Sequence, residues 1–164
     1  MDVTYPRQPS VFSTPRSLYR MVSLAEAVTW TLLIIGMVLK YVAGLGSLPV
    51  LIGGSIHGFV FLCFAGISVV VGVNQDWGVA RIIVAVAMAI VPYATVPFDA
   101  RLVRTGAVDG PWHTEHRGNA RDDQWARALL RWFLRHPALL AVVFFAVIIV
   151  VMATLLFIGP PGGW

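Results

Sequence analysis

Residues 137–158 read PALLAVVFFAVIIVVMATLLFI, an unbroken apolar stretch without a charged side chain. A helix that crosses about 30 Å of hydrocarbon needs roughly 20 such residues. Each Leu, Ile, Val or Phe near the centre favours insertion by about 0.3–0.6 kcal/mol, and no residue here opposes it. This stretch therefore predicts a transmembrane helix, and Pro137 suits its first turn.

Three earlier stretches have the same character, and their charged residues are few. Glu26, Lys40 and Arg81 lie within about two turns of an end, where long side chains can reach the membrane interface. We therefore expect these stretches to span the membrane as well. They are Met21–Ala43, Pro49–Val73 and Trp77–Phe98.

The composition of the whole chain agrees with lipid as its solvent. Of 164 residues, 58% are hydrophobic and 12% are charged, whereas soluble domains are about 45–50% apolar and about 25% charged. The sequence predicts an all-α polytopic transmembrane bundle with four spanning helices and one short interfacial helix. The single cysteine, Cys63, excludes an intramolecular disulfide.

The remaining segments divide the chain into parts. Residues 1–20 are polar and contain three prolines, so we expect a flexible tail there. Tight turns join the first three spans into a core over residues 21–98. An Arg-rich connector at 99–136, the fourth span at 137–158 and a short tail at 159–164 complete the chain.

The connector contains a candidate amphipathic helix at about 123–135. Apolar residues recur there at helical spacing, and arginines repeat every four residues beside them. We expect this helix to lie on the membrane and to contact anionic lipid headgroups; a plain extramembrane loop helix is the alternative. The headgroup candidates are Arg127, Arg131, Arg135, Trp125 and Trp132.

The formal charge of +4 indicates membrane orientation and anionic lipids rather than nucleic acid. Four spans would place the N-terminal tail and the connector on opposite faces. The face with Lys40 and the connector then carries the larger number of basic residues. The positive-inside tendency predicts a cytoplasmic connector and both termini outside.

Ionisable and polar groups at membrane depth are candidates for function. They are Glu26, Lys40, His57, Arg81, Tyr93 and Asp99. Counting residues back from the tight turns predicts a Glu26–Arg81 pair near one face and a Lys40–Asp99 pair near the other. The same counting places His57 near the level of Tyr93.

Two interpretations of these groups stay open. The ion pairs can serve only to fix the helix register. His57 can be an interhelical hydrogen-bonding group or, as the side chain most readily protonated near neutral pH, part of a proton relay.

Small residues in the spans predict close helix packing, because they let the backbones approach. These are Gly54, Gly58, Ala85 and Ala89.

No motif for catalysis or cofactor binding stands out. His113, Glu115 and His116 lack the spacing of a helical zinc signature, and no cysteines are available to complete a site. We therefore predict no metal site, no cofactor and no catalytic residues.

Several short motifs resemble a known family. They are Ala25-Glu26-Ala27, Leu39-Lys40-Tyr41, Gly54-Ser55-Ile56-His57-Gly58-Phe59-Val60-Phe61, Val91-Pro92-Tyr93-Ala94-Thr95 and Phe98-Asp99-Ala100-Arg101. Over roughly Leu18 to Leu102 the chain resembles the small bacterial membrane family named domain of unknown function 3817. Val38 stands where that family usually has proline before Leu-Lys-Tyr. The resemblance implies the fold and a location in a bacterial plasma membrane, and the connector and last span look like an addition to the family's three-helix core.

Three functional classes follow. The first is a non-enzymatic assembly or accessory subunit that packs against other membrane proteins or copies of itself. The second is a small transporter or proton-coupled carrier that uses His57, Glu26 and Lys40. A lipid-modifying enzyme comes last, because no catalytic constellation supports it.

Overall fold

The computed structural model describes residues 14–116, 118 and 124–159, and within them it contains helices and no strands. Three helices are long and apolar enough to cross a membrane. They are α1 (Pro15–Tyr41), α2 (Leu48–Asn74) and α6 (Pro137–Ile158). The all-α polytopic bundle is confirmed, and α6 has the bounds expected from the apolar stretch.

Helix α1 begins earlier than expected. Thr14 caps it by accepting a hydrogen bond from the backbone N–H of Ser17, and Pro15 occupies the first turn. Proline is favoured there because that position has no intrahelical N–H bond to lose. The assignment of residues 15–20 to a flexible tail is therefore wrong. Residues 1–13 and 160–164 lie outside the described part, as does residue 123, the expected start of the amphipathic helix.

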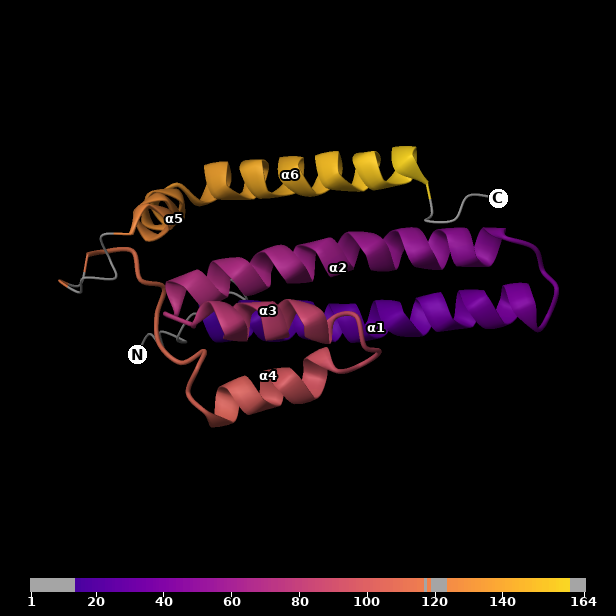
Figure 1. Cartoon of the computed structure of the whole chain (residues 1–164), viewed down its shortest axis with the longest axis horizontal. Helices are drawn as coiled ribbons and strands as arrows, with labels where there is room; N and C mark the ends of the chain where they lie inside the picture. Colours follow the sequence, from indigo (N-terminus) through magenta and orange to yellow (C-terminus); the bar gives the residue numbers. More distant parts are fainter. Residues whose placement is uncertain (1–13, 117, 119–123, 160–164) are drawn as a thin grey trace, which may run out of the picture.

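Helices α1 and α2 form a closely packed antiparallel pair (Figure 1). Gly44 and Gly46 adopt positive φ in the turn between them. A Cβ at Gly36 would lie 2.7 Å from the carbonyl oxygen of Pro49, and one at Gly53 would lie 2.8 Å from that of Leu32. Both positions need glycine, because the obstacle is backbone.

The expected third span at Trp77–Phe98 is not one helix. It is divided between α3 (Val79–Met88) and α4 (Thr95–Arg104). Pro92 has no N–H to continue the ladder of α3, and it disfavours helical backbone at Val91. The chain turns over residues 89–94, with Tyr93 at φ 63°, and α4 runs back beside α3 (Figure 1).

This reversal changes which segments share an end of the bundle. The start of α1, the end of α4 and helix α5 (Trp125–Arg135) lie at one end, and the α1–α2 turn lies at the other (Figure 1). Helix α6 then runs along α2 toward that second end. Three of the described helices are long enough to span, where four spans were expected, and the start of α1 lies at the same end of the bundle as α5 (Figure 1).

The core lies between α1, α2 and the α3–α4 hairpin. Its fully buried apolar residues include Tyr19, Phe64, Val71, Ala85 and Ala89. In α6, by contrast, only Ile148 is buried. The first part of the chain is thus a self-packed unit, and α6 is a peripheral helix.

Candidate functional site

The buried polar centre of the bundle joins α1 to α2. Nδ1 of His57 lies 4.0 Å from Oε1 of Glu26 and 3.1 Å from the hydroxyl oxygen of Thr29. Glu26 is completely buried and His57 is 8% exposed. The Thr29 hydroxyl donates to the backbone carbonyl of Glu26 at 3.0 Å. Because that hydroxyl hydrogen points to the carbonyl, the Thr29 oxygen can accept a hydrogen bond from an Nδ1–H of His57.

The carboxyl group of Glu26 is the unusual member of this centre. Within the described residues, neither of its oxygens has a hydrogen-bond partner. Most buried polar atoms in proteins are paired, and an exception of this kind calls for an explanation. The nearest ionisable partner is His57, at a distance slightly longer than a hydrogen bond.

The turn between α3 and α4 closes this centre through Trp30. The indole N–H of Trp30 donates to the carbonyl of Ala89 at 3.1 Å, and its ring centroid lies 4.4 Å from that of His57. Ala89 follows the last residue of α3, so its carbonyl lies where the helix ladder stops. Trp30 thereby links the unwound turn to the polar centre.

Two further hydroxyl contacts attach the hairpin to α1. Thr95, which is fully buried, donates to the carbonyl of Ser23 at 3.1 Å. The hydroxyls of Tyr93 and Thr31 are 3.1 Å apart. The hairpin is therefore attached to α1 at its tip and at the first turn of α4, on both sides of the Trp30 contact.

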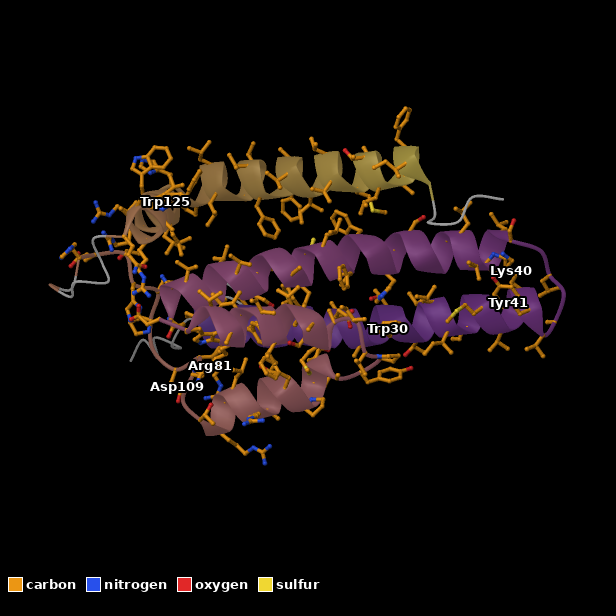
Figure 2. The ribbon with its side chains drawn as sticks, viewed as in Figure 1. Trp30, Lys40, Tyr41, Arg81, Asp109 and Trp125 are labelled. Carbon is orange, nitrogen blue, oxygen red and sulfur yellow. The ribbon has the colours of Figure 1, made fainter. Side chains whose placement is uncertain are left out.

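The predicted Glu26–Arg81 pair is wrong, since Glu26 is buried against His57 and Arg81 is exposed near the start of α3 (Figure 2). The register estimate failed because it was counted from the loop. The contacts of Gly36 and Gly53 instead place Thr29 opposite His57.

The predicted Lys40–Asp99 pair is also wrong. Lys40 lies at the end of α1, with its ammonium 4.9 Å from the ring centroid of Tyr41, whereas the chain reversal returns Asp99 toward the opposite end. Burial raises the pKa of the Asp99 carboxyl, and the nearby guanidinium groups of Arg20 and Arg16 oppose this rise.

The small residues named in the sequence analysis occupy different surroundings. Ala85 and Ala89 are fully buried. Gly54 faces a side-chain atom of Leu33, and Gly58 faces Met152, both at an ordinary 3.7 Å. The tightest approaches to the backbone of the opposite helix belong to Gly36 and Gly53, which the spacing of small residues along one helix does not reveal.

The Arg-rich connector packs on the end of α2. Arg127 forms an ion pair with Asp76, and Arg135 donates from Nε to the carbonyl of Thr114 at 3.1 Å. Trp125 and Trp132 are 79% and 48% exposed. The backbone carbonyl of Asn74 lies 2.7 Å from Nδ1 of His113, which ties the loop to the helix.

No group of three possible metal ligands occurs among the described residues. The arrangement offers one chemical feature instead: an acid and an imidazole, close together and enclosed among apolar helices. The fold and this centre define a polytopic helical membrane protein with a polar interior.

The family is shown by residues 16–104, which match the family described as domain of unknown function (DUF3817). The chain belongs to this family, as the resemblance implied. A Streptomyces coelicolor protein named "putative membrane protein" is 33% identical over 94 residues, which are 57% of this chain and 11% of that protein. No solved structure matches.

Proposed function

We propose that the chain is a non-enzymatic accessory subunit of a bacterial plasma membrane, which packs against a larger membrane protein. The observation that carries this proposal is the exposed apolar surface of α6. In the Streptomyces relative the matching segment makes up 11% of the protein, so there this unit is part of a larger membrane protein.

The peripheral position of α6 supports this role. Of the most apolar 18-residue stretch of α6, 6% is buried, compared with 28% of the corresponding stretch of α1 and 33% of that of α2. Val142 and Ile149, seven residues apart on one stripe, are 66% and 61% exposed. This stripe offers a partner helix an apolar surface, and it contributes little to the packing of the chain itself.

The distribution of charge supports one orientation. The described arginines lie in the first turns of α1, in α3, in α4 and in α5, whereas Lys40 lies at the far end of α1 (Figure 2). Basic residues gather on the cytoplasmic side of membrane proteins. We therefore propose that the connector and the start of α1 are cytoplasmic and that the end of α6 is outside.

Co-purification tests the accessory role. The tagged chain is extracted from its native membranes in mild detergent, and the proteins that remain bound are identified by mass spectrometry. We expect a larger membrane protein that is lost from a Val142→Trp/Ile149→Trp variant. It should be retained by Ile83→Trp, a matched control on the exposed face of α3. A chain that carries no membrane protein in any of these forms contradicts the proposal.

A second candidate function, proton-coupled transport, is favoured by the Glu26–His57 contact. An unpaired carboxylate is costly to bury, so a proton shared between these groups would stabilise the centre. The route through Lys40 is not part of this proposal, because that residue lies far from the centre. Proton uptake by vesicles that contain the wild-type chain, and its loss in His57→Ala, would support transport; equal uptake in both would exclude this role for His57.

A further inference from the structure

A large apolar groove separates α6 from the self-packed part of the chain. Its volume is about 660 Å³, within the range of roughly 300–1,000 Å³ typical of small-molecule sites. Its lining comes from α1, α2, the connector, α5 and α6, and includes Leu18, Ile67, Trp112, Leu134 and Phe144. Nearly all of the exposed lining surface is apolar, so water is a poor occupant.

The groove lies next to the basic end of the bundle. Thr114, Leu134 and Pro137 line it beside α5, while Ile67 and Val70 belong to the last turns of α2. In a membrane it therefore opens within the leaflet that contacts the connector. An occupant would have its apolar part along α6 and its polar part near α5.

The polar rim carries positive charge that is still available. Arg135 uses Nε on the carbonyl of Thr114, a lining residue, and its terminal N–H groups make no hydrogen bond to the described residues. No side chain caps the first turn of α6, which begins at Pro137. A guanidinium and an open helix N-terminus both favour a phosphate group.

The neighbouring arginines are less available. Arg127 is paired with Asp76, and Arg131 lines a small cavity together with Glu115. Among the described arginines of the connector and α5, Arg135 therefore carries the charge that is available at the mouth of the groove.

From this juxtaposition we infer that the groove binds an anionic phospholipid. One acyl chain lies between α2 and α6, and the phosphate lies against Arg135 and the N-terminus of α6. This inference does not depend on the accessory role, because the groove faces the chain's own core and the proposed partner surface is the outward stripe of α6.

Lipid retention in native mass spectrometry tests this site, with the full chain exchanged into detergent containing phosphatidylglycerol or phosphatidylcholine. We expect wild type to retain phosphatidylglycerol preferentially. Ala141→Phe fills the groove and should lose the lipid, whereas Ala146→Phe, on α6 outside the lining, should keep it.

The arginine at the rim is tested separately. Arg135→Gln should lower the preference for phosphatidylglycerol by about tenfold, as expected for one charge-assisted hydrogen bond. Arg101→Gln on α4 is its control.

Quenching of tryptophan fluorescence by brominated phosphatidylglycerol vesicles gives a second measurement. The difference between wild type and Trp112→Phe isolates the tryptophan in the groove, and we expect Ala141→Phe to abolish its quenching. Equal retention and quenching in Ala141→Phe and wild type would overturn the proposal. So would equal retention of the two lipids, or loss of a bound protein rather than lipid from Ala141→Phe.

Discussion

Two apolar segments of equal predicted length behave differently in this protein. Pro137–Ile158 is one helix with its proline in the first turn, whereas Trp77–Phe98 contains Pro92 in its interior and is divided between α3 and α4. The second segment also has buried polar neighbours. Trp30 donates to the Ala89 carbonyl and Thr95 donates to Ser23. Apolar length thus indicates immersion in lipid, while proline position and polar partners decide whether a segment crosses or turns back.

The largest expected effect comes from making α6 resemble the divided segment. Ile149→Pro removes a helix hydrogen bond and adds a steric clash, at a cost of about 3 kcal/mol or more. We expect a sharp fall in the fraction of chains with the end of α6 across the membrane, measured by labelling a Gly159→Cys reporter. Ile149→Ala, which shortens the same side chain without breaking the helix, should retain the crossing; equal losses in both variants would contradict this explanation.

The second-largest effect tests the packing of α1 against α2, the two helices that support the hairpin. In Gly53→Ala the new Cβ would lie 2.8 Å from the backbone carbonyl oxygen of Leu32, and overpacking of this kind costs about 1–3 kcal/mol. The free energy of unfolding in mixed detergent titrations should fall by that amount. Gly54→Ala is the matched control, since its nearest atom is a side-chain carbon at 3.7 Å. A greater loss in Gly54→Ala than in Gly53→Ala would refute the assigned register.

A smaller effect tests the anchor of the turn itself. Trp30→Phe keeps an aromatic ring but removes the hydrogen bond to Ala89, which we expect to cost about 1–2 kcal/mol. Faster hydrogen exchange should appear over residues 89–94, measured by mass spectrometry. Trp132→Phe, at a half-exposed position on α5, should leave that exchange unchanged. Unaltered exchange in Trp30→Phe would show that the indole does not hold the turn.

The smallest effect concerns the attachment of the connector. Arg127 and Asp76 form a partly buried pair, with side chains 12% and 25% exposed, so Arg127→Gln should reduce the free energy of unfolding by about 1 kcal/mol or less. Arg16→Gln removes an exposed contact to Asp109 at 3.5 Å and should reduce the free energy of unfolding by less than Arg127→Gln does. The loss of stability in Arg127→Gln should remain at high salt concentration. If it disappears there, the pair is exposed to solvent.

Much of the fold was predictable because hydropathy reports the solvent of each segment. The bounds of α6 and the approximate bounds of α1 and α2 follow from apolar length alone. The hairpin was not predictable in this way, although Pro92 marks the place where α3 stops. Its return depends on Trp30 and Thr95 meeting distant backbone carbonyls, and a single sequence gives no sign of such contacts.

The polar centre was predictable in part. Glu26 and His57 were identified because ionisable residues are rare in lipid, but their pairing was not. The register of α1 against α2 is set by Gly36 and Gly53 touching backbone on the opposite helix. Counting from the loop misses that contact by several residues, which is enough to hide the approach of His57 to Glu26.

The central claim, that the Trp77–Phe98 segment enters the membrane and returns to the same side, has a direct test. Single cysteines are placed at Thr14, Gly46, Thr105 and Gly159 in a Cys63→Ser background, and intact cells are labelled with a membrane-impermeant maleimide. The claim predicts that Gly46→Cys and Gly159→Cys react in intact cells, and that Thr14→Cys and Thr105→Cys react only after the membrane is opened. If Thr105→Cys instead reacts from the same side as Gly46→Cys, the segment crosses the membrane and the account is wrong.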